Sequence, residues 1–288
     1  MSDGEHRIDE PLVRGLVDHQ FPQWAALPLR PVVESGTDNA IYRLGEKLVV
    51  RLALRDGPDQ PETKVRQWLP RLAPILPLEV PVPVAVGAPG YGYPWFWEIH
   101  TWLDGTYVPI DSIDAVDAVE NLGGLIGALW RFERAGAPLG RGVPLTERDD
   151  RFRYWLKRYD GDVTAARDAW EEALAAPAWN GPPLWHHGDL DARNWLVRGG
   201  QITAVIDWGH MGVGDPAVDL MVAWKLRSAT ALDIFRGVVA ADDATWSRAR
   251  GWVVSQAVAI LAYYTEETNP TLRREAESWL ALALSDIA

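Results

Sequence analysis

The sequence predicts an α+β fold in two parts, a small N-terminal antiparallel β-sheet followed by a larger, mainly helical region. Between residues 32 and 54, short apolar and β-branched runs alternate with glycine-containing turns, a pattern typical of paired strands. Beyond residue 113, apolar residues recur at helical spacing over long segments. Because 288 residues can bury two cores, we expect one domain over residues 1–103 and a second over residues 104–288.

The composition is that of an ordinary soluble globular protein, with 48% hydrophobic and 24% charged residues. The net charge of -12 repels phosphate backbones, so nucleic acid is not an expected partner, whereas a cationic small molecule would be attracted to an acidic cleft. The absence of cysteine excludes disulfides and zinc–thiolate sites. The first ten residues are polar and acidic, and no apolar run is long enough for a membrane span, so we expect a cytoplasmic protein.

The first part is expected to open with a short amphipathic helix and continue as strands around a loop and a tight turn at Gly45-Glu46. Pairing Leu44 with Lys47 across that turn places Arg51 opposite Ala40, beside the loop. Backbone amides and a cation then meet at one end of the sheet, where the phosphates of a nucleotide could sit. The loop has a single glycine, so an ordinary hairpin connection is the alternative. The candidate nucleotide-binding residues here are Ser35, Gly36, Thr37, Asn39 and Arg51.

The remaining elements are predicted from the positions of the prolines and from the spacing of the apolar residues. A helix at residues 59–72 is interrupted by Pro70, and further prolines keep the chain extended until an aromatic-rich strand at residues 93–103. Asp215-Pro216 marks a helix start, an aspartate cap with proline in the first helical position. The helices expected in the second part cover residues 113–135, 146–159, 163–176, 246–264 and 270–287.

The stretch from His187 to Asp219 carries the chemistry-bearing residues. Gly199-Gly200 separates two apolar runs, which predicts a hairpin closed by a two-residue turn. If Arg198 pairs with Gln201, Asn194 falls opposite Val205, and Asp207 lies two residues further, about 7 Å along the strand. Cross-strand partners share a face, so we expect Asn194 and Asp207 to point to one side, where a single cation could bridge them.

The spacing D-x-x-x-x-N from Asp189 to Asn194, with His187 two residues upstream, resembles the catalytic loop of protein kinases. Ile206-Asp207-Trp208-Gly209 stands where those enzymes carry D-F-G. In that scheme the first aspartate accepts or orients the proton of the substrate hydroxyl, and the asparagine and second aspartate hold Mg²⁺ on the nucleotide phosphates. Amide and carboxylate oxygens suit a hard, octahedral cation.

The same stretch is also similar to the aminoglycoside phosphotransferase family, kinase-like enzymes that act on small molecules. The family motifs are matched by His187-Gly188-Asp189 with Asn194, by Ile206-Asp207-Trp208, and by Gly214-Asp215-Pro216 through Asp219-Leu220. A G-T-x-N-x-x-Y-R-L pattern is matched from Gly36 to Leu44. Relatives often read H-P-G where Asp191-Ala192-Arg193 stands, so the contacts of this loop differ while the metal and proton groups remain.

The resemblance implies a protein-kinase-like two-lobed fold and a phosphotransferase that uses Mg²⁺ and ATP or GTP to phosphorylate a hydroxyl of a small molecule, first of all an aminoglycoside antibiotic. It implies that Asp189 is the catalytic base and that Asn194 and Asp207 are metal ligands. Arg51 would bind the donor phosphates with Glu62 as its carboxylate partner, and the backbone around Glu98, His100 and Trp102 would receive the base. His187, Asp215 and Asp219 would support the catalytic loop.

Three alternatives stay open at this point. The acceptor could be a macrolide or a metabolite such as an amino alcohol or a sugar, because enzymes of one fold share their machinery and differ in substrate. The chain could be a catalytically silent nucleotide-binding module, since Arg51 and Glu62 depart from the usual pattern. A metal-dependent hydrolase could use His186, His187, Asp189 and Asp207, although two-metal centres need more ligands.

Overall fold

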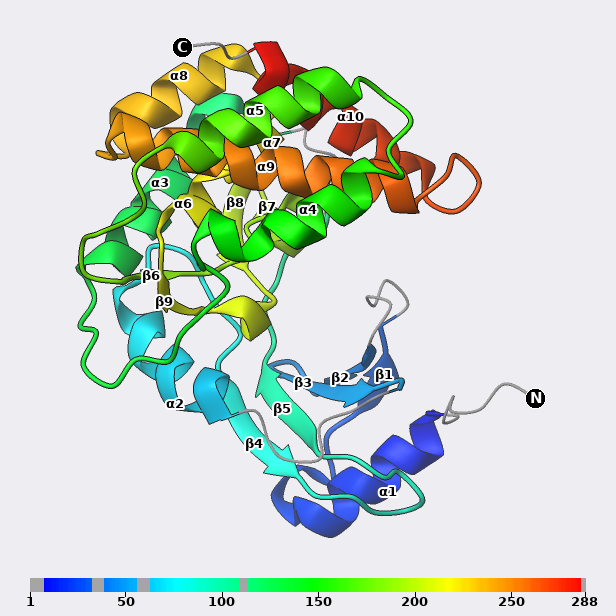
Figure 1. Ribbon diagram of the computed structural model, residues 1–288. Coiled ribbons are helices and arrows are strands. Elements are labelled where there is room, and N and C mark those ends of the chain that lie inside the picture. Colours follow the sequence, from blue (N-terminus) through cyan, green and yellow to red (C-terminus); the bar gives the residue numbers. More distant parts are fainter. Residues whose placement is uncertain (1–7, 33–38, 56–62, 109–112, 286–288) are drawn as a thin grey trace. The chain divides into compact units, whose positions relative to one another are not determined.

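The computed structural model describes residues 8–32, 39–55, 63–108 and 113–285 (Figure 1). The chain divides into two compact units, Met1–Pro74 with Glu79–Asp104, and Ile75–Leu78 with Gly105–Ala288. The described strands of the first unit form an antiparallel sheet, and the second unit is mainly helical, so the α+β composition expected from the sequence is confirmed. None of the described helices is both long and apolar enough to cross a membrane.

The first unit is built on a five-stranded sheet among its described residues, in the order β1-β2-β3-β5-β4. The strands are β1 (Leu29–Pro31), β2 (Asn39–Leu44), β3 (Leu48–Ala53), β4 (Pro83–Gly87) and β5 (Trp97–Thr101), and every neighbouring pair is antiparallel. Strand β4 was not expected from the sequence. It lies at the sheet edge and begins with Pro83, which is where a residue without a backbone N–H is tolerated.

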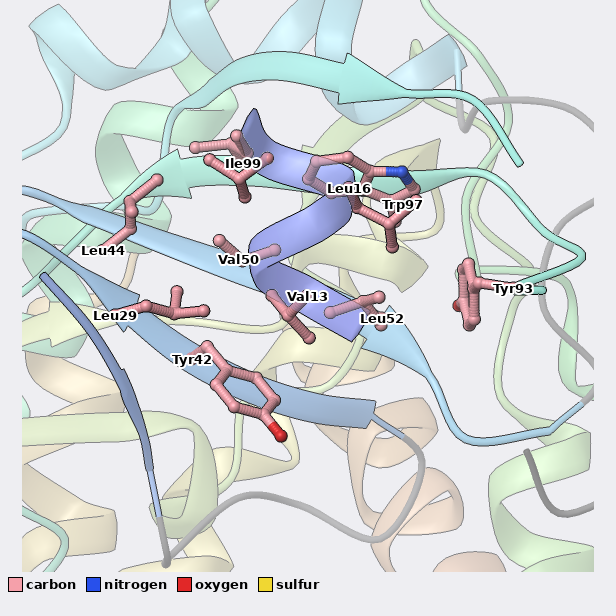
Figure 2. Packing of buried hydrophobic residues seen from close by; sticks show 11 residues of the cluster. Val13, Leu16, Leu29, Tyr42, Leu44, Val50, Leu52, Tyr93, Trp97 and Ile99 are labelled. Carbon is pink, nitrogen blue, oxygen red and sulfur yellow. The ribbon is translucent and has the colours of Figure 1, made fainter. Parts of the chain in front are cut away.

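Helix α1 (Glu10–Gln20) covers one face of this sheet, and the two together make the core of the first unit (Figure 2). Asp9 caps the helix by accepting a hydrogen bond from the Leu12 N–H at 3.1 Å. The apolar stripe of the helix, Val13, Leu16 and Val17, is fully buried. On the sheet side the cluster includes Tyr42, Leu44, Val50, Leu52, Trp97 and Ile99.

The turn between β2 and β3 is one residue longer than expected. Leu44 pairs with Leu48 rather than with Lys47, so three residues form the turn, and Gly45 adopts a left-handed conformation with φ 63°. As a result Arg51 lies opposite Ile41, not Ala40, and opposite Glu98 on its other side. The expected pairing was therefore wrong by one residue, although Arg51 stays on the strand that the sequence predicts.

Helix α2 (Thr63–Leu72) contains Pro70 in its last turn and ends two residues later. In the second unit, β6 (Leu184–His186) pairs with β9 (Gly212–Gly214), and β7 (Trp195–Arg198) pairs with β8 (Gln201–Val205). Both of these ribbons are antiparallel. They lie among the helices of this unit: α3 (Ala115–Arg131), α4 (Asp149–Leu156), α5 (Val163–Ala175), α6 (Ala217–Leu220), α7 (Val222–Lys225), α8 (Ala229–Val238), α9 (Asp243–Tyr263) and α10 (Pro270–Ser285).

Helix α9 is the centre of the helical unit, because α4, α5, α6 and α10 all pack against it. This explains why its buried residues are not confined to one apolar stripe and include Arg248 and Arg250. Aspartates cap several of the helices: Asp114 begins α3, Asp162 begins α5 and Asp242 begins α9. Helix α8, which begins after Ser228, was not expected from the sequence.

Candidate active site

The β7–β8 ribbon differs from the expected hairpin by one residue. Arg198 pairs with Gln201 as expected, and Gly199 and Gly200 both have positive φ, as a two-residue turn of this kind requires. Between Leu196 and Val197 the register shifts, so that Thr203 is an extra residue on β8. Asn194 therefore lies beside Ile206, whose N–H donates to the Asn194 carbonyl at 2.9 Å, and not opposite Val205. The argument that placed Asn194 and Asp207 on one face of a regular ladder was wrong.

Asp207, which follows β8, has an unusual backbone conformation. Its backbone is left-handed, with φ 62° and ψ 65°, a conformation that costs energy for a residue other than glycine. Its side chain is exposed, and among the described residues its carboxylate has no hydrogen bond or ion pair. Such strain is found at functional sites more than elsewhere, and it turns the Asp207 carboxylate away from the regular strand direction.

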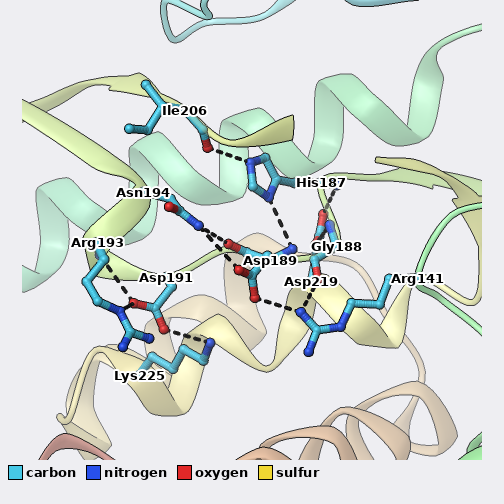
Figure 3. Close-up of polar contacts among 10 residues, drawn as sticks. All are labelled: Arg141, His187, Gly188, Asp189, Asp191, Arg193, Asn194, Ile206, Asp219 and Lys225. Atoms are coloured by element: carbon cyan, nitrogen blue, oxygen red, sulfur yellow. Dashed lines mark hydrogen bonds and ion pairs between the residues drawn. The ribbon is translucent and has the colours of Figure 1, made fainter. Parts of the chain in front are cut away.

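The buried carboxylate of Asp219 on α6 braces the loop that carries Asp189. Asp219 accepts hydrogen bonds from the backbone N–H of His187 at 2.7 Å and of Gly188 at 2.8 Å (Figure 3). Burial raises the pKa of Asp219 to about 7, against the opposite effect of these two amides. Gly188, with φ 86°, makes the sharp turn that follows. Asp219 therefore fixes the backbone of the two residues that precede Asp189.

His187 ties the Asp189 loop to the segment before Asp207. Its Nδ1 accepts a hydrogen bond from the Asp189 N–H at 3.1 Å, and its Nε2 lies 3.0 Å from the Ile206 carbonyl. Burial lowers the pKa of His187 to about 4, so the ring is neutral at physiological pH, and these partners require the proton to be on Nε2. Both ring nitrogens are thus engaged, which removes His187 as a metal ligand and with it the hydrolase hypothesis.

Asn194 faces Asp189 with its amide nitrogen. Its Nδ2 donates to the Asp189 carbonyl at 2.9 Å and lies 3.5 Å from the Asp189 Oδ2. The side-chain oxygen of Asn194 consequently points away from Asp189, as Figure 3 shows. The amide oxygen of Asn194 and the carboxylate of Asp207 are both of the oxygen type that Mg²⁺ takes as ligands.

A residue that the sequence did not single out, Arg141, makes the closest contact to the Asp189 carboxylate. Its Nη1 lies 2.7 Å from Asp189 Oδ1 and 3.2 Å from the Gly188 carbonyl. Gly140 and Gly142 flank it, and a Cβ at either position would lie within 2.8 Å of the His186 ring. The two glycines let this loop approach β6 and β9 so closely that Arg141 reaches Asp189. In the sequence, only the G-R-G triplet at residues 140–142 indicates this close approach.

A second network fixes the middle of the catalytic loop between Asp189 and Asn194. Asp191 Oδ2 lies 3.0 Å from Lys225 Nζ on α7, and its Oδ1 lies 2.8 Å from Arg193 Nε. Burial alone would raise the pKa of Asp191, but Lys225 and Arg193 together hold it well below its usual range. Lys225 also lies 5.0 Å from the ring centre of Trp279 on α10. Of the residues that depart from the family pattern, Asp191 therefore ties the loop to α7, and Arg193 bonds to Asp191 within the loop.

In the first unit, the structure brings together only some of the expected nucleotide-binding residues. Arg51 pairs across the strands with Glu98, and the nearby His100, Arg51 and Arg66 lower the pKa of Glu98 despite its burial. His100 is buried, and its Nε2 contacts Glu98 Oε2 at 2.9 Å.

Glu98 and His100 lie inside β5, which is paired on both sides, so neither backbone is at a free strand edge. Trp102 follows this strand; its backbone N–H donates to the Lys47 carbonyl, and its Nε1 donates to Asp104. Asn39 is the first residue of β2. Ser35, Gly36, Thr37 and Glu62 lie outside the described residues.

Asp215 lies one residue before the N-cap of α6, which is Pro216, so the expected aspartate cap with proline in the first helical position is off by one residue. Its Oδ1 accepts a hydrogen bond from the Ala217 N–H at 3.0 Å at the start of α6. Both of its oxygens also contact the guanidinium of Arg248 on α9, at 2.7 Å and 3.2 Å. Both side chains are buried, so this bidentate pair joins the segment before α6 to the central helix.

Replacing Asp219 with asparagine is expected to lower both stability and turnover. An asparagine offers one acceptor oxygen, so one of the two buried amides loses its partner, at a cost of about 1–3 kcal/mol. The free energy of unfolding in urea and kcat would be measured, with Asp233→Asn, an exposed acid on α8, as the control. An unchanged free energy of unfolding would show that Asp219 does not hold the loop.

Comparison with known proteins places this geometry in a family. The sequence profile described as "Phosphotransferase enzyme family" matches residues 30–252. No curated protein sequence gives a significant match.

Solved structures share the fold at low identity. The GDP complex of aminoglycoside 2'-phosphotransferase-IIIa is 16% identical with a TM-score of 0.68, covering 97% of this chain and 99% of that chain. Macrolide 2'-phosphotransferase MphH from Brachybacterium faecium is 24% identical with a TM-score of 0.60, covering 97% and 99%. A thermostable mutant of aminoglycoside phosphotransferase APH(4)-Ia, in ternary complex with AMP-PNP and hygromycin B, is 15% identical with a TM-score of 0.65, covering 95% and 98%.

These matches confirm the protein-kinase-like two-lobed α+β fold that the motifs imply. The family profile covers well over half of the chain and includes the whole stretch from His187 to Asp219. The chain therefore belongs to the phosphotransferase enzyme family.

Proposed function

We propose that this protein is a Mg²⁺-dependent kinase that transfers the γ-phosphoryl group of ATP or GTP to a hydroxyl of a small molecule in the cytoplasm. Residues 1–103 bind the nucleotide, with Arg51 at its phosphates, and residues 104–288 carry the catalytic loop and the acceptor site. The observation that carries the proposal is the bracing of Asp189. Asp219, His187 and Asn194 all bond to its loop, while its carboxylate stays 25% exposed.

In this mechanism Asp189 accepts the proton of the acceptor hydroxyl. The alcohol oxygen forms a bond to the γ-phosphorus, the bond from that phosphorus to the bridging oxygen breaks, and the nucleoside diphosphate leaves. Arg141 occupies Asp189 Oδ1, so Oδ2 is the oxygen available for the proton. Little covalent chemistry is asked of the protein, because positioning and charge neutralisation supply most of the rate enhancement.

Asn194 and Asp207 are the residues that would hold Mg²⁺ in this scheme, through the amide oxygen and the carboxylate. Bound there, the cation would neutralise negative charge on the phosphates of the donor. The neutral His187 contacts both the backbone of Asp189 and that of Ile206, next to Asp207. It therefore holds these two segments at a fixed spacing.

The donor and acceptor classes to be tested first come from the solved neighbours, which hold GDP, AMP-PNP, kanamycin or hygromycin B. The net charge of -12 suits a cationic aminoglycoside, and MphH directs attention to macrolides. Amino alcohols and sugars complete the panel. Transfer of ³²P from ATP and from GTP to each acceptor tests the proposal, and a failure of the chain to phosphorylate any member, while it still binds nucleotide, would favour the silent binding module.

Replacing Asp207 with alanine is expected to weaken the binding of the Mg²⁺–nucleotide complex by about tenfold or more, because one of two protein ligands to the cation is lost. Titration calorimetry with Mg²⁺–AMP-PNP measures this, and the same titration in EDTA is the control. The expected loss appears only with Mg²⁺ present. Equal affinity of the variant and the parent in Mg²⁺ would argue against a metal ligand at this position.

A further inference from the structure

Two arginines lie against Trp252 beside the catalytic loop, and a third arginine lies near one of them. Arg148 lies with its guanidinium 4.2 Å from the ring centre of Trp252, and the guanidinium of Arg141 lies 6.0 Å from the same ring centre. Arg151, on the first turns of α4, is close enough to act on the charge of Arg148. Because Arg141 also contacts Asp189 at 2.7 Å, this cluster adjoins the carboxylate that would meet the acceptor hydroxyl.

Among the described residues, Arg148 forms no ion pair. Burial, together with the neighbouring charges of Arg141 and Arg151, lowers the pKa of Arg148 to about 10, and the group stays protonated at neutral pH. Among the described residues, Arg148 Nε has no hydrogen-bond partner. The indole N–H of Trp252, a residue only 1% exposed, has none within the same described ranges. Both groups are donors without an acceptor in the described part of the chain, which costs free energy.

The acidic side chains around the cluster are used elsewhere or exposed. Asp149, next to Arg148, accepts from Arg153 at 2.9 Å and from the Trp170 indole at 2.8 Å. Asp189 is paired with Arg141. Glu147 and Asp150 are exposed. Arg148 and Arg151 are therefore guanidinium groups without an ion-paired carboxylate among the described residues, although the whole chain is acidic.

We propose that the acceptor of this kinase is a hydroxyl compound that also carries an anionic group, a carboxylate or a phosphate, bound by Arg148 and Arg151 beside Trp252. Planar guanidinium groups suit both anions, because they donate two parallel hydrogen bonds. The proposal rests on the proposed function and narrows it. A polycationic aminoglycoside would meet like charge here, so the first choice suggested by the net charge is replaced by an acidic hydroxyl compound.

The donor phosphates are the other source of anionic oxygens near Asp189. Arg141 touches the catalytic carboxylate and is as well placed for the transferred phosphoryl group as for the acceptor. Arg148 and Arg151 contact neither Asp189 nor Asn194 in the described part of the chain, so we assign them to the acceptor. The test must therefore measure acceptor and donor affinities separately.

Inorganic sulfate is the first probe, titrated by calorimetry into the full-length protein without nucleotide. Arg148→Gln and Arg151→Gln are each expected to weaken sulfate binding by about tenfold, the effect of losing one charge-assisted contact of about 1.4 kcal/mol. Arg148→Lys keeps the charge on Trp252 and is expected to lose less. Arg274→Gln, an exposed arginine on α10, is the matched control.

Competition with a matched sugar series decides the chemistry of the ligand. Glucuronate is expected to displace sulfate, whereas glucose and glucosamine, which differ from it in charge, are not. Displacement by glucosamine as strong as by glucuronate would overturn the proposal, as would equal sulfate affinity in all variants. A loss of Mg²⁺–AMP-PNP affinity in Arg148→Gln would assign the cluster to the donor and overturn it too. No titration requires turnover, so these results are separate from the acceptor screen that tests the kinase itself.

Discussion

Replacing Asp189 with asparagine is expected to lower kcat by about 10²- to 10⁴-fold, the usual effect of losing a general base. The asparagine keeps the shape of the side chain, and its amide oxygen can still accept the hydrogen bond from Arg141 that Oδ1 accepts now. The contacts of Asn194, His187 and Asp219 with this loop go to backbone atoms, so the loop should stay in place. Turnover should fall without a change in nucleotide affinity.

The measurement is single-turnover phosphoryl transfer to whichever acceptor the screen identifies, with Mg²⁺–AMP-PNP affinity determined in parallel. Asp233→Asn, a change of the same chemistry on the surface of α8, controls for the loss of one negative charge. If Asp189→Asn transferred phosphate as fast as the parent, proton acceptance by this residue would be ruled out. If it lost nucleotide affinity instead, Asp189 would belong to the donor site.

Local signals in the sequence were sufficient for the elements that depend on neighbours along the chain. The apolar and β-branched runs on either side of the Gly45 turn predicted β2 and β3, and the apolar stripe between residues 113 and 135 predicted α3. The Gly199-Gly200 turn predicted the β7–β8 ribbon with Arg198 opposite Gln201. In each of these cases the period of the side chains and the turn residues carry the information.

The register inside that ribbon could not be predicted in the same way. A bulge needs no special residue, and Thr203, the extra residue here, is a good strand former. Pairing the residues one for one from the turn placed Asn194 opposite Val205, whereas in the structure Asn194 lies beside Ile206. The αL backbone of Asp207 was equally hidden, because aspartate is common in both conformations and the tertiary contacts around it decide between them.

The contacts of Arg141 and Lys225 were missed because they join segments far apart in sequence. Arg141 lies 48 residues before Asp189, and Lys225 lies 34 residues after Asp191. No periodicity connects such pairs; only the fold brings them together. The departure at Asp191 and Arg193 was visible in the sequence, but its meaning depends on Lys225, which stands in a short helix that no pattern predicted.

The buried Asp191–Lys225 pair should be the contact of the catalytic loop whose one-sided loss costs the most stability. Replacing Asp191 with alanine leaves the ammonium of Lys225, 1% exposed, without the carboxylate that it contacts at 3.0 Å beside Trp279. We expect the free energy of unfolding to fall by about 3–5 kcal/mol, since a buried charge that loses its partner retains its full desolvation cost. Urea unfolding followed by tryptophan fluorescence measures this, and a loss below about 1 kcal/mol would contradict the assignment.

A double variant, Asp191→Leu with Lys225→Met, separates stability from the position of the loop. It removes both buried charges and fills their space with apolar groups, so it is expected to recover most of the lost stability, as paired hydrophobic replacements of buried ion pairs often do. Arg193, half exposed, then loses its Asp191 contact but remains hydrated, at little cost in stability. Recovery of the unfolding free energy with kcat still low would mean that the ion pair positions Asp189, whereas recovery of both would mean that it serves the fold alone.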